Sequence, residues 1–432
     1  MSDRRSEVHI ISKTQWATPQ RGTFWVAGAD DRVHGALSGP GSESLVVDSP
    51  LLLPDLPEAT GGVISLTGEL DEMVLDLVHG VLHDGTEVTL VRLRRYTWLL
   101  EAFADKSSQQ QWEARAVVTG AHLSSDEAHR IRTLSVETDY SLDWSQAGAP
   151  GANATQHVMA EGESDLGQVK VIDATDTQRS IASASFTRRA WIEVDFRDPV
   201  DVETVVATIA QDLLSLVSFA VGKPDRVVYI GAVIDDLSAP VEIHVDYLEH
   251  GDDRDESRVH VSRQVLPLDE VPAGVGELLD AWLSLRQEHR GIVNLISTDR
   301  APFQFLEQRF IAVIQAAEVA HAQWYGGYDL EPEEFERRIN ELGSADLREE
   351  TREWAVRKLE GRNSPSLAER LRQLIEGSGL DLPRHVVEAL VKAKNLRNPL
   401  SHGGTSKVEP EYVYWLTHMW LWIVRREVLA KL

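Results

Sequence analysis

The pattern of apolar and polar positions changes character once along the chain, near Gly274. From about Gly22 to Phe196, short apolar segments are separated by turn residues, a pattern typical of β-strands. The clearest pair spans 74–93, where Asp84-Gly85 separates two strands, as in a β-hairpin. Further strands are expected at 114–122, 134–142, 168–172, 181–187, 190–196, 227–231 and 241–245. This spacing predicts an antiparallel sandwich or barrel.

One helix interrupts these strands. Apolar residues recur at helical spacing from Asp201 to Val221, and Gly222 with Pro224 follows as a stop signal. The stretches 146–156 and 249–256 are rich in small or acidic residues and are expected to be loops. The first domain, residues 1–270, is therefore predicted to be β-rich with an inserted helix, which makes the whole chain α+β.

After Gly274 the apolar period is that of an α-helix. One stripe runs along 278–296, and a second, from Phe303 to Trp324, alternates spacings of three and four. Shorter helices are expected at 347–359, 367–375, 385–396 and 411–429, the last rich in aromatic residues. Stripes of this kind form bundle cores, so residues 274–432 are predicted to be an all-α domain.

Composition narrows the possible chemistry. The chain has 432 residues, 42% hydrophobic and 26% charged, which is ordinary for a globular protein of two or three domains. The absence of cysteine excludes disulfides, thiolate nucleophiles and cysteine zinc sites. We find no apolar run near the roughly 20 residues that span a bilayer, and Met1–Glu7 is not followed by the apolar core of a signal peptide. We therefore expect a cytoplasmic protein without a membrane partner.

The charge is distributed unevenly. The net charge of −26 would repel a polyphosphate. Residues 384–432, however, carry eight Lys or Arg against four acids, a balance of +4, and the rest of the chain carries −30. Basic residues near a C-terminus can also serve only to complement helix dipoles. The pattern argues against a general nucleic-acid binder and favours a small, specific RNA contact in the basic segment.

That segment contains Arg397-Asn398 followed after three residues by His402. Histidine can move a proton near neutral pH, arginine can clamp a phosphate through parallel hydrogen bonds, and asparagine can orient a hydroxyl or phosphoryl oxygen. On one helix, residues five apart differ in direction by about 140°, so Arg397 and His402 need a break to converge. We expect Pro399 to supply part of this break between the last two helices, and Gly403-Gly404 to allow close approach of a ligand or second subunit.

Two resemblances follow from these residues. Arg397-Asn398-x-x-x-His402 in a helical bundle resembles the signature of HEPN nucleases. Upstream, Gly22-Thr23-Phe24-Trp25, Val33-His34-Gly35-Ala36-Leu37, His79-Gly80 and Asp84–Leu90 resemble the N-terminal domain of ApeA-type anti-phage proteins, which carry a HEPN nuclease behind a sensing domain. The resemblance implies a homodimer in which two motifs share one cleft. It also implies a positioning role for an acidic residue at Glu318.

The motif is suited to metal-free RNA cleavage. His402 would take the proton of a ribose 2′-hydroxyl, whose oxygen attacks the neighbouring phosphate and leaves a 2′,3′-cyclic phosphate. Arg397 would stabilise the phosphoryl charge and Asn398 would position the reacting groups, with Lys394, Ser401 and Glu318 in support. No metal or other cofactor is expected. Alternatively, His402 is a turn histidine and Arg397 an ion-pair partner.

Other candidates favour structural roles. Glu318 and His321 share a helix face and are either positioning groups or an ordinary solvated pair. His79 and His83 lack a third ligand for a metal. The tryptophans of the last helix could stack on bases, although packing or a dimer contact is the simpler role for Trp415, Trp420 and Trp422.

These observations predict an anti-phage effector in which a β-rich regulatory domain controls a HEPN endoribonuclease. Its partners would be RNA, with tRNA as one candidate, a phage-derived trigger and a second copy of the chain. One alternative is a catalytically silent protein that binds nucleotides or serves as a dimerising scaffold. Another makes the β-rich domain a ligand-recognition module and the bundle an adaptor.

Overall fold

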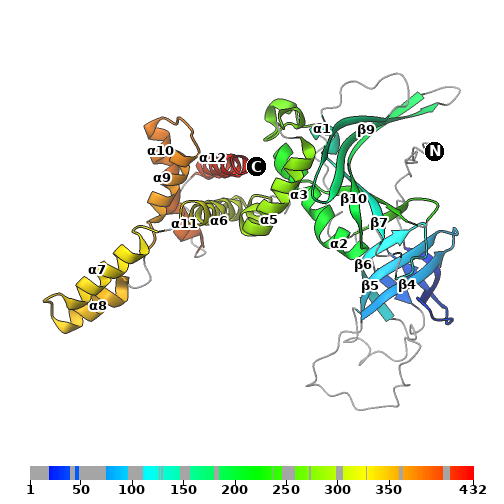
Figure 1. Ribbon diagram of the computed structural model, residues 1–432, viewed down its shortest axis with the longest axis horizontal. Helices are drawn as coiled ribbons and strands as arrows, with labels where there is room; N and C mark the ends of the chain where they lie inside the picture. The colour runs from blue at the N-terminus through cyan, green and yellow to red at the C-terminus, as the bar shows by residue number, and fades with distance from the viewer. Residues whose placement is uncertain are drawn as a thin grey trace, which may run out of the picture. The chain divides into compact units, whose positions relative to one another are not determined.

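The computed structural model describes residues 19–38, 44–47, 74–95, 110–125, 127, 130–145, 156–179, 184–235, 237–245, 258–271, 274–297, 305–326, 328–359, 363–401 and 409–432. The chain divides into two compact units, Met1–Asp280 and Ala281–Leu432, and the helix α5, Val275–Ser297, runs across the boundary (Figure 1). The first unit is a β-barrel domain with extra strands and an inserted helix, and an all-helical region follows it.

The first unit is built on one antiparallel sheet of 12 strands. The strands are β1 Gln20–Val26, β2 Val33–Leu37, β3 Ser44–Val47, β4 Val74–Leu82, β5 Glu87–Arg95, β6 Gln110–Thr119, β7 Ile131–Thr138, β8 Gln156–Glu163, β9 Gly167–Arg179, β10 Ala184–Val200, β11 Val227–Ile234 and β12 Val241–His244. Their order is β3-β2-β1-β4-β5-β6-β12-β11-β7-β10-β9-β8.

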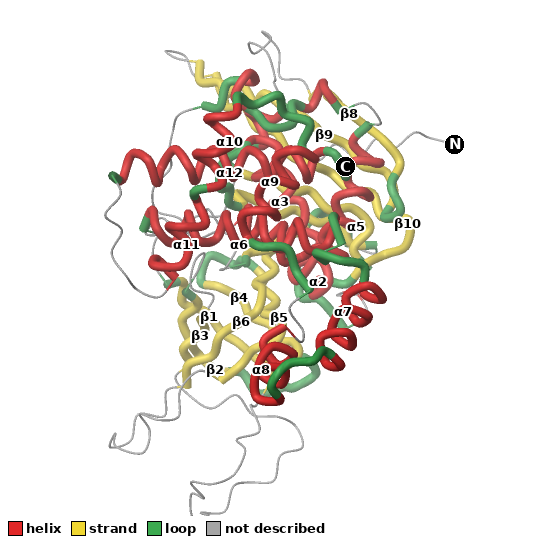
Figure 2. The backbone as a smooth tube through the Cα atoms, turned by 90° about the vertical axis from the view of Figure 1, so that its left-hand side faces the viewer, coloured by secondary structure: helices red, strands yellow, loops and turns green. Residues whose placement is uncertain are grey.

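A barrel closes within this sheet because β6 pairs with β3 as well as with β5. The start of β6, Gln110–Glu113, pairs with β3, whereas Val117–Thr119 pairs with β12. One strand therefore belongs to both the barrel and the sheet that extends from it. Figure 2 shows β1–β6 gathered in one group. The predicted barrel-like, antiparallel architecture is confirmed.

The glycines of the N-terminal signature make room for Phe24 in the barrel core. Phe24 is fully buried and lies opposite Gly80 in the register of β1 with β4. A Cβ at Gly80 would lie 2.4 Å from the ring of Phe24, and one at Gly35 would lie 2.6 Å from the carbonyl oxygen of Val46. Phe24, Gly35 and Gly80 of the resemblance are thus packing requirements of one core.

The predicted hairpin is confirmed as β4 and β5. Gly85 has φ +87, a conformation that favours glycine, and Asp84 Oδ1 accepts a 2.9 Å bond from the Thr86 N–H. That bond holds the pKa of Asp84 below its usual value. The sequence 82–86 therefore fixes the turn and the register of the two strands.

The inserted helix is also confirmed, as α2 Val202–Thr204, a π-helical turn Val205–Ile209 and α3 Ala210–Val221. Asp201 caps its start, and Gly222, with φ +77, ends it. The expectation that no apolar run approaches membrane-spanning length was wrong, since Val202–Val221 passes by length and composition with a mean hydropathy of 1.7. Because 78% of that window is buried inside the protein, the segment is explained as a core helix.

Some strand boundaries differ from the prediction. Residues 184–187 of the first expected strand and the expected strand 190–196 are parts of one long strand, β10, which pairs with β9 along most of its length. Residues 181–183 lie outside the described residues. Strand β8 was missed, because its side chains are mostly exposed and give no apolar alternation. A four-residue helix, α1 Ser141–Trp144, replaces the predicted end of β7. The predicted loop at 249–256, and residues 146–155 of the other, lie outside the described residues.

The second unit contains only helices among its described elements. They are the end of α5, α6 Leu306–Trp324, α7 Pro332–Ser344, α8 Glu349–Leu359, α9 Leu367–Gly377, α10 Arg384–Val391, α11 Ala393–Ser401 and α12 Pro410–Leu429. Helix α6 is central and packs on α12, α9 and α11. Its predicted apolar stripe is confirmed from Phe310 to Ala320, whereas Phe303 lies outside the described residues.

Two helical predictions were wrong. The helix expected at 385–396 is two helices, α10 and α11, with a turn at Lys392. The expected break at Pro399 does not occur, because α11 continues through Pro399 and ends two residues later at Ser401. Proline lacks an N–H, so α11 passes Pro399 without the bond that an N–H there would donate to the Asn395 carbonyl oxygen. Helix α7 was not predicted, although Phe335, Ile339 and Leu342 recur at helical spacing along it.

Candidate functional site

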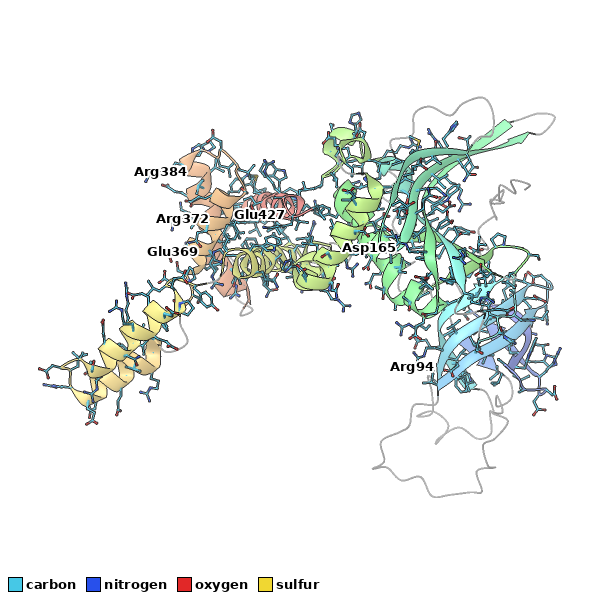
Figure 3. All side chains as sticks on the ribbon, in the orientation of Figure 1. Arg94, Asp165, Glu369, Arg372, Arg384 and Glu427 are labelled. Carbon is cyan, nitrogen blue, oxygen red and sulfur yellow. The ribbon has the colours of Figure 1, made fainter. Side chains whose placement is uncertain are left out.

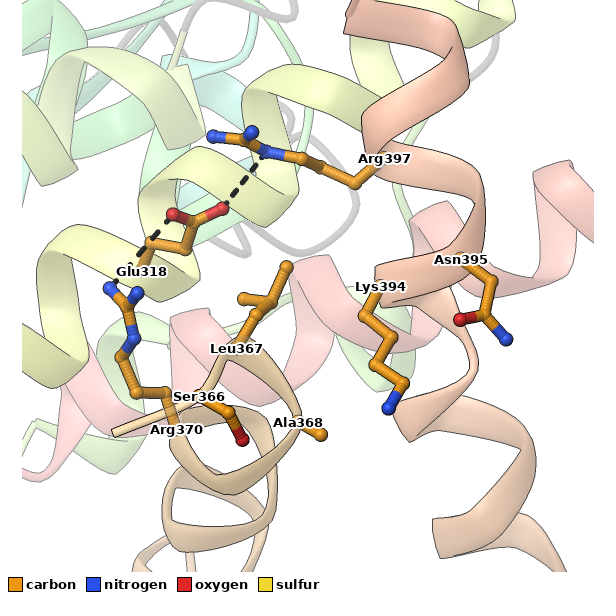
Figure 4. A pocket seen from close by; sticks show the side chains of 8 residues that line it. All are labelled: Glu318, Ser366, Leu367, Ala368, Arg370, Lys394, Asn395 and Arg397. Atoms are coloured by element: carbon orange, nitrogen blue, oxygen red, sulfur yellow. Dashed lines mark ion pairs between the residues drawn. The ribbon is translucent and has the colours of Figure 1, made fainter. Parts of the chain in front are cut away.

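A charge cluster joins three helices of the second unit. Arg397 Nε of α11 lies 3.1 Å from Glu318 Oε1 of α6, and Arg370 Nη1 of α9 lies 4.0 Å from Glu318 Oε2 (Figure 4). The three side chains are 19–28% exposed. One partly buried carboxylate therefore holds two guanidinium groups in place from opposite sides.

Local sequence explains how the two arginines are held. Ala393 and Leu396 are buried and anchor α11, which leaves Arg397 at the margin of the packed face. Ser366 and Glu369 form a capping box that starts α9. Arg370 follows directly, and its Nε donates a 3.0 Å bond to the Pro365 carbonyl oxygen. Both guanidinium groups are thus placed by helix ends and buried neighbours.

The Arg397–Glu318 pair is close but not aligned as a hydrogen bond, since the N–H of Arg397 Nε does not point at Glu318 Oε1. A phosphate can accept two parallel N–H bonds from one guanidinium, a stronger arrangement than a single misaligned contact.

A cavity of about 330 Å³ adjoins the cluster. Its lining comprises Glu318, Ser366, Leu367, Ala368, Arg370, Lys394, Asn395 and Arg397 (Figure 4). Three of these side chains are cationic and one is anionic, so the lining has a charge of +2. Such a surface attracts anions.

His321 lies on the same helix as Glu318 but has a different environment. It is fully buried, stacks on Tyr325 with ring centroids 5.5 Å apart, and its Nε2 bonds to Gln373 Oε1. Burial lowers the pKa of His321, and the nearby Arg370 charge lowers it further. His321 is therefore a neutral packing residue, and no ion pair joins it to Glu318 within the described part of the chain.

The structure brings together Arg397, Glu318 and Lys394 of the predicted set. Asn398 and Ser401 lie in α11, and His402 lies outside the described residues, as do Gly403 and Gly404. The expected convergence of Arg397 with His402 thus stays a prediction. The sequence did not point to Arg370, because nothing in the pattern of α9 distinguishes Arg370 from Arg372.

Several of the remaining candidates take part in packing contacts. Trp420 is buried and donates to the Leu390 carbonyl oxygen, Trp415 stacks on Tyr412, and Trp422 is 45% exposed. His79 stacks on His122 and bonds to the Leu123 carbonyl oxygen. Across the described residues, no three His or carboxylate groups are placed to bind a metal.

Comparison with known families agrees with this architecture. Residues 20–282 match the family model described as ApeA N-terminal domain 1, and residues 311–432 match the one described as Apea-like HEPN. The fold and site thus define a β-barrel domain followed by a HEPN domain. The first match covers more than half of the chain, and the chain belongs to the ApeA family. No curated protein and no solved structure gives a significant match. A HEPN domain is consistent with a ribonuclease-type defence effector.

Proposed function

We propose that this protein is a defence effector whose HEPN domain cleaves RNA without a metal. The observation that carries the proposal is Arg397, which lies on a cationic cavity in the HEPN domain and belongs to the Arg397-Asn398-x-x-x-His402 motif. The β-barrel domain would regulate the activity in response to a phage-derived trigger. We place the protein in the cytoplasm, where RNA, including tRNA, is accessible.

In the proposed reaction His402 takes the proton from a ribose 2′-hydroxyl. The 2′ oxygen bonds to the adjacent phosphorus, the bond to the 5′ oxygen breaks, and that oxygen takes a proton from water. The products are a 2′,3′-cyclic phosphate and a 5′-hydroxyl end. Arg397 would stabilise the charge on the phosphoryl oxygens, and Asn398 would position the reacting groups.

Cleavage of single-stranded RNA tests this proposal. We expect cleavage that persists in EDTA, because the motif supplies a base and a phosphate clamp but no carboxylate cluster for Mg²⁺. His402→Ala and Arg397→Ala should each abolish it, whereas His385→Ala and Arg384→Ala on the exposed face of α10 serve as matched controls (Figure 3). Cleavage by the His402→Ala protein at the wild-type rate would remove the proposed base.

The active form is proposed to be a homodimer in which two motifs share one cleft. Specific activity should then fall when the protein is diluted below its dimer dissociation constant, and sedimentation at micromolar concentration should give the mass of two chains. A fully active monomer would contradict the shared cleft without deciding the role of His402.

A second candidate function is a silent nucleotide-binding protein, and the anion-attracting cavity of about 330 Å³ is the observation that favours it. The two functions differ in products. The nuclease releases 2′,3′-cyclic phosphate ends, which mass spectrometry detects, whereas the silent protein binds nucleotides and leaves RNA intact.

A further inference from the structure

The positive charge at the cavity beside Arg397 exceeds what the carboxylate of Glu318 can neutralise. Glu318 faces both Arg397 and Arg370, so one negative charge opposes two positive ones. Lys394, one turn before Arg397, is exposed and forms no ion pair within the described part of the chain. The chain as a whole has a net charge of −26, yet the lining of this cavity contains three cationic side chains and one acid. Ion pairing with Glu318 does not account for all three cations.

The cavity has room for a phosphate group. Its volume of about 330 Å³ far exceeds the roughly 10–15 Å³ that a water molecule requires. Lys394 and Arg397 are three residues apart on α11 and so lie on the same side of the helix. A ligand held by Lys394 would therefore lie next to one held by Arg397.

Helix α9 completes the opposite wall. Arg370 reaches the cavity from its first turn, and the lining includes Leu367 and Ala368. The capping box uses the N–H groups of Ser366 and Glu369. The backbone N–H groups of Leu367 and Ala368 form the positive end of the helix dipole, which acts together with the charges of Lys394 and Arg370.

We propose that this cavity binds a backbone phosphate of single-stranded RNA adjacent to the one that is cleaved, through Lys394 and Arg370. The inference rests on the proposed function, because it assigns a neighbouring subsite to the same substrate. Lys394 and Arg370 contact the neighbouring phosphate, whereas Arg397 contacts the phosphate that reacts.

Binding of a labelled single-stranded deoxyribo-oligonucleotide to the full chain, followed by fluorescence anisotropy, tests the subsite without cleavage, since the probe lacks a 2′-hydroxyl. Lys394→Gln and Arg370→Gln should each weaken binding about tenfold at low salt and reduce the salt slope by about 0.7. Lys392→Gln and Arg372→Gln are matched controls, because each removes the same charge from an exposed position two residues away. Figure 3 labels Arg372. Both control proteins should bind like wild type.

RNA cleavage separates the subsite from the chemistry. Lys394→Gln should raise KM about tenfold with kcat little changed, whereas Arg397→Ala abolishes turnover. If the wild-type chain binds the probe with the expected Lys394 and Arg370 dependence but cleaves no RNA, the phosphate site stands and the proposed function fails.

Three results would overturn the subsite. One is equal affinity and salt slope for Lys394→Gln and Lys392→Gln, and a second is failure of the wild-type chain to bind the probe. The third is Lys394-dependent binding of ATP that is tighter than binding of the probe, which would assign the cavity to free nucleotides. Because Lys394 is exposed and forms no described ion pair, a folding defect cannot explain the Lys394→Gln result.

Discussion

Glu318 connects the two arginines that face the proposed substrate. Its carboxylate lies 3.1 Å from Arg397 Nε and so fixes where that guanidinium rests. We expect Glu318→Gln to lower kcat for RNA about tenfold, because Arg397 loses the carboxylate that positions it. RNA binding should stay equal or tighten, because the cavity loses its one negative charge. Glu307→Gln, an exposed acid on the same helix, is the control. A rise in KM with unchanged kcat would instead place Glu318 in direct substrate binding.

His321 predicts a pH dependence of stability. Burial lowers its folded-state pKa below the ordinary value of 6.5, so the unfolded chain binds this proton more tightly. The stabilisation that neutral His321 provides is therefore fully present above the ordinary histidine pKa. It declines as the pH falls toward the lowered pKa of the folded state. His321→Phe, which keeps the ring stacked on Tyr325, should reduce the loss of Tm between about pH 7 and pH 5.

The exposed His385→Gln is the matched control for this measurement, because it removes a histidine without opening a packed site. Thermal unfolding of the three proteins across the pH range gives the comparison. An equal pH dependence in wild type and His321→Phe would show that other groups cause it.

Among the helices, Gly377 tests how closely α9 approaches the end of α6. A Cβ at Gly377 would lie 1.7 Å from Tyr325 Oη and 2.5 Å from Tyr325 Cζ. The Tyr325 hydroxyl donates a 2.9 Å bond to the buried Glu427 of α12, and burial raises the pKa of Tyr325 to about 12. Gly377→Ala would displace the ring and should destabilise the fold by about 1–3 kcal/mol in urea unfolding.

Gly343 in α7 provides the contrasting substitution. A Cβ there would meet nothing within 4 Å. Gly343→Ala should therefore stabilise the helix by about 0.5–1 kcal/mol, because alanine loses less backbone entropy than glycine. If both substitutions destabilise equally, the close contact of Gly377 with Tyr325 is not what limits that position.

Among helices, strands and turns, the sequence predicted the elements whose signals are local. Each of these signals is contained in one short segment of the chain. The Asp84-Gly85 turn, the stop at Gly222 and the apolar stripe of α6 are examples, and each was confirmed. Helix α7 was missed, although Phe335, Ile339 and Leu342 give it the spacing of an amphipathic helix. The break placed at Pro399 was wrong, because α11 continues through the proline to Ser401.

The site depends on contacts that no local pattern contains. Glu318 and Arg397 are brought together by the packing of α6 against α11. The motif and the family resemblance identified Arg397 and Glu318, but the pairing of the two, and the contribution of Arg370 from a third helix, required the tertiary structure. A capping box at Ser366 predicts where α9 starts, but not what its first turn faces.

For the whole molecule, the distribution of charge suggests how the two parts of the chain divide the work. The family match assigns residues 20–282 to an ApeA N-terminal domain, and the basic segment 384–432 lies inside the HEPN match. Outside that segment the chain carries −30. We propose that this negative charge opposes the approach of RNA, and that a trigger that rearranges the N-terminal domain lifts that opposition.

Expression of residues 274–432 alone tests this restraint. The fragment begins just before α5 and contains all of the HEPN match. We expect it to be more toxic to cells than the full chain at equal protein level, because the acidic domain is missing, and the His402→Ala version of the fragment should be harmless. Colony counts after induction and RNA integrity measure the two effects. A fragment that folds and dimerises but neither harms cells nor cleaves RNA would mean that the N-terminal domain recruits substrate or supports the dimer.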